Sequence, residues 1–298
     1  MTTLFELTRR NLKVFFKDKG RFISSLITPI ILLVLYATFL ARVYKESFLS
    51  AIPETFAVDE KIISATVAGQ LISSLLAVSC VTIAFCANLL MITDKADGQI
   101  RDLTVTPVKR AALAGSYFLA TAASTLIVTI SALAFSLLYL STQGWFLSVG
   151  DVVCLVFDVL LLTLFGTALS SCIHFFLSTN GQASAAGTIV STGYGFICGA
   201  YMPIASFSPG LQKVLSLLPG TYGTALVKNH MMRGVFAEMS RVGFPDEAID
   251  GIKSGIDCTI KFFGKTVSVP MMYVIMTAAV VFFTGLFVLL HVFFKRKR

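Results

Sequence analysis

The chain has 298 residues, of which 56% are hydrophobic and only 13% are charged, and its formal net charge is +8. Soluble domains contain about 25% charged residues, and the mean hydropathy of +0.83 agrees with this deficit. The composition argues against a water-soluble enzyme. It excludes an intrinsically disordered chain, because disordered chains are polar and rich in charge. It indicates an integral membrane protein.

Residues 1–21 precede the first apolar segment and predict an amphipathic helix on the membrane surface. Over residues 4–19, charged side chains recur at three- and four-residue steps on one side of the helix. The other side carries mainly apolar residues, namely Leu4, Phe5, Leu12, Phe15 and Phe16. This pattern is typical of a helix that lies in the interface with its basic residues near the headgroups. The alternative is a solvated basic segment.

Five long segments of the chain contain no charged residue: 22–41, 62–93, 111–150, 159–212 and 266–294. A helix needs about 20 apolar residues to cross the hydrocarbon core. The segment 159–212 is long enough for two helices, with a polar break at 178–182. The sequence therefore predicts an all-α polytopic membrane protein with six transmembrane helices, near 22–41, 64–92, 111–140, 152–177, 184–203 and 270–294.

The distribution of basic residues predicts how the chain is oriented. Six spans place both termini on one side, and that side has 14 basic and five acidic residues, counted over 1–21, 93–110 and 295–298. Because basic residues are enriched in cytoplasmic loops, we expect a multi-pass protein of the cell membrane with both termini in the cytoplasm. Topology and contact with anionic membrane lipid account for the basic excess without a nucleic acid.

The cytoplasmic loop 94–110 breaks the membrane pattern, because it is short and rich in charges of both signs. Ile100 and Leu103 lie three residues apart, so a helical turn would present an apolar ridge with charges around it. Such a ridge suits docking into a groove on a cytoplasmic partner. Pro107 ends this helix by favouring an extended residue before it. The alternative is an ordinary solvated loop.

This loop resembles the corresponding loop of type-2 ABC exporter permeases, through the pattern acid-Gly-Gln-Ile-x-x-Leu-x-x-Thr-Pro-x-x-Arg that ends at Arg110. The resemblance covers nearly the whole chain. It implies that residues 1–21 form an elbow helix and that residues 22–298 form a six-span permease domain. Within that domain, it implies that residues 94–110 contain a coupling helix that docks on the ATPase subunit. The residues implied in ATPase coupling are Asp97, Gly98, Gln99, Ile100, Arg101, Asp102, Leu103 and Pro107.

The extracellular loop 204–269 is longer than in compact members of that family. Ser208 and Pro209 predict the start of a helix, and Pro219 predicts its end and the start of a second helix. Both pieces are expected to be too short to span, and the resemblance implies short outer helices that re-enter the membrane. Residues 234–265 predict an external cap whose buried face consists of Phe244, Ile249, Ile252 and Ile256. A functionless insertion is the alternative.

The sequence contains no G-x-x-x-x-G-K-[ST] motif, whose backbone amides and lysine hold nucleotide phosphates. It also lacks the motifs of membrane metalloproteases and serine hydrolases. We therefore expect no catalytic residue, no metal site and no cofactor on this chain. The resemblance implies that ATP and Mg²⁺ are bound by separate ABC ATPase subunits, and that a second permease chain, identical or different, completes the complex.

Two sets of residues inside the predicted spans are candidates for function. Asp158 lies about 9 Å from the outer end of its span if that span begins at Val152. Because a charge that faces lipid is costly, Asp158 is expected to contact a cationic or polar substrate, or to be a paired structural acid. Ser191, Gly195 and Gly199 recur every four residues, which favours close helix packing, either between two permeases or within one chain.

These observations together predict the membrane subunit of an ATP-driven exporter. Its mainly apolar spans favour an amphiphilic or drug-like substrate, and a lipid-linked polysaccharide or a peptide is the alternative cargo. A membrane scaffold or receptor without an ATPase partner is the alternative from a different class. An ATPase partner distinguishes transport from the scaffold.

Overall fold

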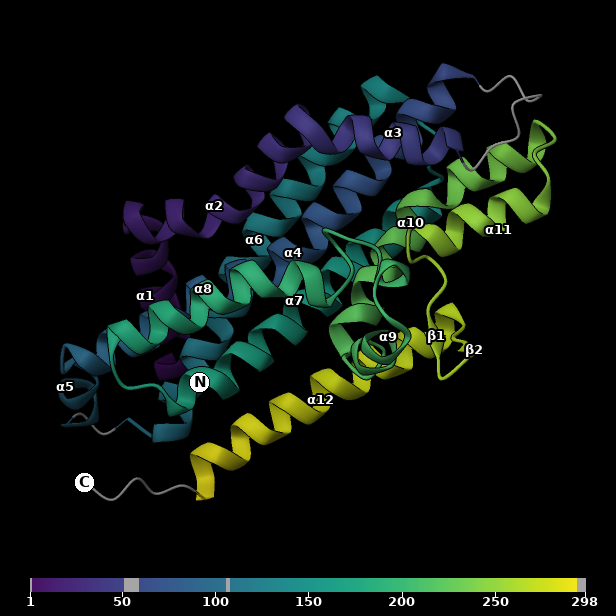
Figure 1. The fold of residues 1–298 in the computed structure, drawn as a ribbon. Helices are drawn as coiled ribbons and strands as arrows, with labels where there is room; N and C mark the ends of the chain where they lie inside the picture. Colours follow the sequence, from purple (N-terminus) through teal and green to yellow (C-terminus); the bar gives the residue numbers. More distant parts are fainter. Residues whose placement is uncertain (1, 51–58, 106–107, 294–298) are drawn as a thin grey trace.

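The computed structural model describes residues 2–50, 59–105 and 108–293. The described chain is almost entirely helical (Figure 1). Its long helices are α2 (Lys19–Leu35), α4 (Glu60–Ala96), α6 (Arg110–Gln143), α7 (Val149–Phe176), α8 (Asn180–Ile197), α10 (Pro219–Arg241) and α12 (Val269–Phe293). The shorter elements are α1 (Thr2–Lys17), a π-helical turn (Tyr36–Leu40), α3 (Ala41–Ser50), α5 (Gln99–Val105), a 3₁₀ turn (Ile204–Ser206), α9 (Pro209–Leu215) and α11 (Asp246–Gly255).

Helix α4 lies at the centre of the bundle and packs against α2, α6, α7, α8 and α10. Small and apolar residues of α4 itself face every side of this helix. Nearly all of its length is therefore buried by other helices. At Gly166 of α7 an added Cβ would lie 2.9 Å from the carbonyl oxygen of Cys80. Glycine at this position therefore lets α7 cross α4 at backbone contact, as small residues do between membrane helices.

Five helices among the described residues are long and apolar enough to cross a membrane. They are Lys19–Glu46, Glu60–Ala96, Arg110–Gln143, Val149–Phe176 and Val269–His291. They correspond to five of the six predicted spans and extend past most of the predicted limits, because helices continue beyond the apolar segment that marks the hydrocarbon core. Their outward faces are apolar and exposed, as at Val274 and Phe282 of α12, which suits contact with lipid.

The predicted span 184–203 corresponds to α8, which has 18 residues and ends at Ile197. Asn180, Gln182 and several serines and threonines make α8 more polar than the five helices above, and it is not among them. Helix α8 packs against α4. The described residues thus show five spans by length and composition and one further helix of marginal apolarity.

The second helix expected in 204–269 is longer than predicted. Instead of a short piece after Pro219, α10 runs for 23 residues and packs against α4, α7 and α12. Gly223, near its start, contacts Leu162, which lies about 20 Å along α7 from the start of that helix. Gly234 contacts Phe146, just before α7 begins. Helix α10 therefore begins deep in the bundle and runs to the end of the bundle at which α7 begins. Burial of the apolar side of α10 keeps this helix continuous.

The predicted cap is confirmed in its buried face, because Phe244, Ile249, Ile252 and Ile256 all belong to one buried cluster with residues of α4 and α10. A two-stranded hairpin follows, in which β1 (Lys261–Phe262) pairs antiparallel with β2 (Lys265–Thr266). Beneath the cap, Lys228 Nζ donates a 2.6 Å hydrogen bond to the Gly199 carbonyl. The same atom lies 3.7 Å from Asp257 Oδ2, so a buried ion pair fastens the cap to α10.

The two ends of the bundle differ in composition and in the elements that they carry. Figure 1 shows α1, α5 and the last turns of α12 gathered at one end, with α11 at the opposite end. We call the first the inner end and the second the outer end. The two ends therefore present different surfaces.

Replacing Gly234 by Ala is expected to destabilise the protein by about 1–3 kcal/mol, the usual cost of overpacking. The added Cβ would lie 1.9 Å from the carbonyl oxygen of Phe146, so α10 or the turn before α7 must move. Thermal unfolding in detergent measures the loss. The matched control is Gly251→Ala in α11, where the Cβ meets nothing within 4 Å and helix propensity favours Ala. Equal melting temperatures for the two variants would contradict the close contact.

Candidate functional site

A buried polar cluster at the inner end joins four helices. Arg10 of α1 forms a salt bridge with Asp94 near the end of α4. Arg10 Nη2 donates a 2.6 Å hydrogen bond to Oε1 of Gln99, the first residue of α5. Tyr117 of α6 donates to Asp94 Oδ2 at 2.7 Å. We call these four residues the inner joint.

Electrostatics hold the inner joint together. The Asp94 side chain is only 3% exposed, whereas that of Arg10 is 34% exposed. Burial disfavours the charge of the Arg10 guanidinium, but the hydrogen bond and charge of Asp94 outweigh this effect and raise the pKa of Arg10. A buried carboxylate is costly unless it is paired and hydrogen-bonded. Asp94 therefore holds α1 against α4, and Arg10 extends that hold to α5.

Apolar and neutral polar contacts reinforce the attachment of α1. Leu7 and Val14 pack against a buried cluster that includes Leu90 of α4 and Leu113 of α6. Asn11, which is itself buried, donates a 3.3 Å hydrogen bond to Ser116 Oγ of α6. The amphipathic helix predicted in residues 1–21 is thus present as α1, and part of its apolar side faces the bundle.

The turn that leads into α5 depends on two of the predicted coupling residues. Asp97 caps α4, and its backbone N–H donates to the Thr93 carbonyl. Gly98 follows with φ +82°, a left-handed conformation that costs other residues about 1–2 kcal/mol. A glycine directly after the helix end is the usual way to stop a helix and turn the chain. Asp97 and Gly98 therefore fix the direction in which α5 leaves α4.

Ile100 and Leu103 of α5 face the opposite way from the sequence-based expectation. Ile100 and Leu103 are half-buried and pack against the cluster of α4 and α6. The exposed side of α5 carries Gln99, Asp102 and Val105, and Val105 is 86% exposed. The predicted ridge of Ile100 and Leu103 is therefore an internal contact, because a seven-residue helix needs those side chains to hold it on the bundle. Arg101 lies in α5, and Pro107 lies outside the residues that the structure describes.

Asp158 lies in α7 as a completely buried and paired acid. Its Oδ2 is 2.6 Å from His230 Nδ1 of α10, and its Oδ1 accepts a 2.5 Å hydrogen bond from Tyr273 of α12. Sequence reasoning left open a paired acid at this position but found neither partner. The partners lie 72 and 115 residues away, and no short-range pattern connects residues at such separations.

The small residues that recur every four positions do not form one continuous helical stripe. Ser191 and Gly195 lie in α8, but Gly199 lies beyond its end with φ +74°. An added Cβ at Gly195 would collide with the ring of Tyr201, and one at Gly199 would lie 2.6 Å from Asp257 Oδ2. Both glycines are thus covered by their own chain. A contact between two permeases through these residues stays a prediction.

The inner joint is suited to transmitting movement. An ion pair and hydrogen bonds connect its members between helices, so α1, α4, α5 and α6 meet at one point. A family model described as ABC-2 type transporter matches residues 2–232. The chain belongs to this family. As an ABC-2 family member it is a multi-pass membrane protein, the permease part of an ABC transporter.

The family match includes the inner joint, α5, Asp158 and His230. The cap (residues 234–265) and α12, which contains Tyr273, lie beyond the matched residues. A search of curated proteins found no significant match. Fold and family thus agree on an all-α polytopic membrane protein.

Arg10→Ala is expected to loosen α1 and α5, because it leaves Asp94 buried without its cation. The loss of stability is expected to be about 1–3 kcal/mol, measured by hydrogen exchange of α1 and α5 in the full-length protein. The matched control is Arg9→Ala, because the neighbouring Arg9 is exposed and forms a surface pair with Glu6, at 4.0 Å. Faster exchange in both variants alike would contradict a specific role for Arg10.

Proposed function

We propose that this chain is the permease subunit of an ATP-driven exporter that uses ATP hydrolysed by separate ABC ATPase subunits. The observation that carries the proposal is the inner joint, in which the buried Asp94 joins α4 to α1 and α6 and Arg10 adds a hydrogen bond to Gln99 of α5. The family match supports an ABC transporter permease. The lack of a phosphate-binding motif in the sequence supports a separate ATPase.

The proposed topology has six spans in the cell membrane, with α8 as the sixth. An even number of spans accounts for the position of α1 and the last turns of α12 at the inner end in Figure 1. The basic residues of 1–21 and 93–110 lie at the same end, which supports its assignment to the cytoplasm. In this frame α9 and the first part of α10 form a re-entrant outer segment, and residues 234–265 form an extracellular cap.

The proposed coupling begins where an ATPase subunit contacts the exposed side of α5, at Gln99, Asp102 and Val105. Closure of the ATPases on ATP displaces α5, and the joint carries that displacement to α4 and α6. Because α4 packs against α2, α6, α7, α8 and α10, the bundle responds as a rigid body and opens outward. Gln99 belongs to the proposed contact surface and also accepts a hydrogen bond from Arg10, so it connects this surface with the inner joint.

The proposed cargo is an amphiphilic or drug-like molecule, since the spans offer mainly apolar surface. A lipid-linked polysaccharide or a peptide is the alternative cargo. A second permease chain and two ATPases complete the proposed assembly, with ATP and Mg²⁺ bound by the ATPases. A scaffold or receptor without an ATPase is the non-transport alternative. In that case no ATPase binds to α5.

Val105→Asp is expected to remove copurification of a protein that carries G-x-x-x-x-G-K-[ST], together with transport-coupled ATPase activity. Val105 is exposed on α5, so the substitution places a charge in the proposed contact without disturbing the chain's own packing. Coupled activity is expected to fall at least tenfold, while membrane insertion is unchanged. Both are measured on complexes purified from membranes.

Val149→Asp is the matched control, because Val149 is 82% exposed at the outer end and undergoes the same chemical change. It should retain both the ATPase partner and its activity. Full activity in Val105→Asp, or equal loss in the two variants, would contradict docking on α5.

A further inference from the structure

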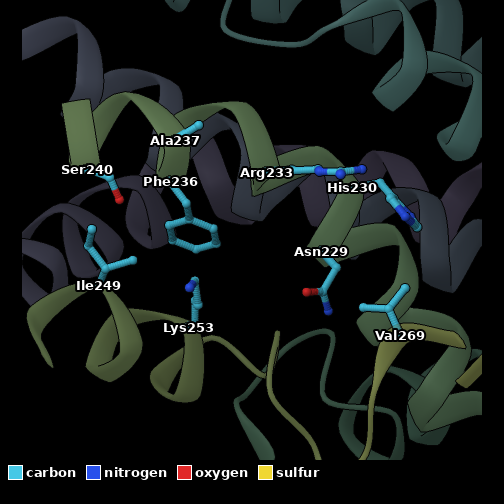
Figure 2. Close-up of a pocket in the computed structure, with 9 residues that line it drawn as sticks. All are labelled: Asn229, His230, Arg233, Phe236, Ala237, Ser240, Ile249, Lys253 and Val269. Atoms are coloured by element: carbon cyan, nitrogen blue, oxygen red, sulfur yellow. The ribbon is translucent and has the colours of Figure 1, made fainter. Parts of the chain in front are cut away.

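The outer end contains a cavity of about 450 Å³ that neither the family nor the proposed coupling explains. It lies between α10 and α11, close to the first residue of α12 (Figure 2). Figure 2 shows Phe236 of α10 facing Ile249 and Lys253 of α11. The lining residues are Asn229, His230, Arg233, Phe236, Ala237, Ser240, Ile249, Lys253 and Val269.

The polar part of the lining is basic. Arg233 and Lys253 are cations, His230 is a third nitrogen group, and none of the lining residues in the described chain is acidic. Two acids lie just outside the lining: Asp151 is 3.5 Å from Arg233, and Asp250 is 3.1 Å from Lys253. The nature of these two pairs decides whether the cations are able to bind a ligand.

Both pairs leave hydrogen-bond donors for a ligand. Oδ2 of Asp151 is already occupied, because it accepts from the backbone N–H and the hydroxyl of Ser148 at the start of α7. Only Oδ1 faces Arg233, whose guanidinium has five N–H donors and whose side chain is 67% exposed. The Lys253–Asp250 pair lies on the surface, where such pairs contribute about 0–1 kcal/mol. An incoming anion therefore competes easily with both.

His230 supplies a fixed nitrogen at the base of the cavity. Its Nδ1 is 2.6 Å from Asp158 Oδ2, so any bond to a ligand comes from Nε2. Asp158 is in turn held by the Tyr273 hydroxyl at 2.5 Å. Asp158 thus acts on a ligand through His230, as a positioning residue. It does not line the cavity.

The remaining lining is apolar, through Phe236, Ile249 and Val269. Lys253 Nζ lies 5.6 Å from the centre of the Phe236 ring, so the cation and an apolar surface are adjacent. A ligand that fits this combination has a compact negative group and an apolar body. A phosphate, carboxylate or sulfonate meets the first need, and Arg is well suited to bind it through paired donors.

We infer that this outer cavity binds the acidic head of an anionic amphiphile, through Arg233, Lys253 and His230. The inference concerns binding, and it rests on the proposed function only where the bound amphiphile is taken to be the cargo. The same acidic group occurs in soluble amphiphiles and in anionic lipids, and the experiment separates these two sources.

The test is calorimetric titration of the full-length protein in phosphatidylcholine nanodiscs with octyl phosphate. Octyl phosphate is expected to bind one to one, and tighter than either inorganic phosphate or zwitterionic octylphosphocholine. Arg233→Gln and Lys253→Gln are each expected to weaken it about tenfold or more, since each removes a charge-assisted bond. No ATPase is needed, so the outcome is independent of the test of coupling at α5.

Arg241→Gln is the matched control, because Arg241 is also exposed on α10 but pairs with Glu238 outside the cavity. Its affinity should equal that of the unaltered protein. The inference is overturned by absent binding, by equal affinity for octylphosphocholine or inorganic phosphate, or by equal losses in Arg241→Gln and Arg233→Gln.

Nanodiscs that contain phosphatidylglycerol identify the source of the ligand. If the site takes a lipid headgroup, phosphatidylglycerol competes and weakens octyl phosphate binding in the unaltered protein. If the site takes a soluble amphiphile, the affinity is the same in both kinds of nanodisc. Either result supports an acidic-head site once the Arg233 variant has lost binding.

A double-variant comparison tests the positioning role of Asp158. Asp158→Asn and His230→Gln are each expected to weaken binding of octyl phosphate. If Asp158 acts only through His230, adding Asp158→Asn to His230→Gln causes no further loss. Additive losses would show that Asp158 supports the fold in general and would remove it from the site.

Discussion

The contact between Arg10 and Asp94 is the constraint on which the inner end of this protein depends. A carboxylate as deeply buried as Asp94 is strongly unfavourable unless a cation and further donors satisfy it. Arg10 and Tyr117 meet that need, and in doing so they fix the positions of α1 and α6 relative to α4. Gln99 joins the same arginine, so α5 shares the arrangement. A seven-residue helix that has little stability alone is thereby attached to the bundle.

The sequence was most informative where the membrane limits the choices. Uncharged segments such as 62–93 and 111–150 predict long helices because a spanning backbone must satisfy its hydrogen bonds internally. The helix within 1–21 and the buried face of the cap, such as Ile249 and Ile252, were also predictable. In both cases apolar residues recur at helical spacing, and that pattern depends only on local geometry.

The sequence was least informative where residues far apart meet. The partners of Asp158 and Asp94 come from other helices, and a single sequence does not encode such pairings locally. The side of α5 that faces outward depends on what α4 and α6 present to Ile100 and Leu103. Helix α10 exceeds the prediction because burial against its neighbours sustains a helix of low apolarity. In each case tertiary packing decides what local pattern leaves open.

The central claim is that the exposed side of α5 is where an ATPase subunit contacts this chain. It is tested most directly by placing a photo-crosslinking residue at position 105 and irradiating intact membranes of the source cell. The account predicts a crosslink to a protein that carries a phosphate-binding loop, and none from the same residue at position 149. A crosslink to lipid alone from position 105, or to the ATPase from position 149, would contradict it.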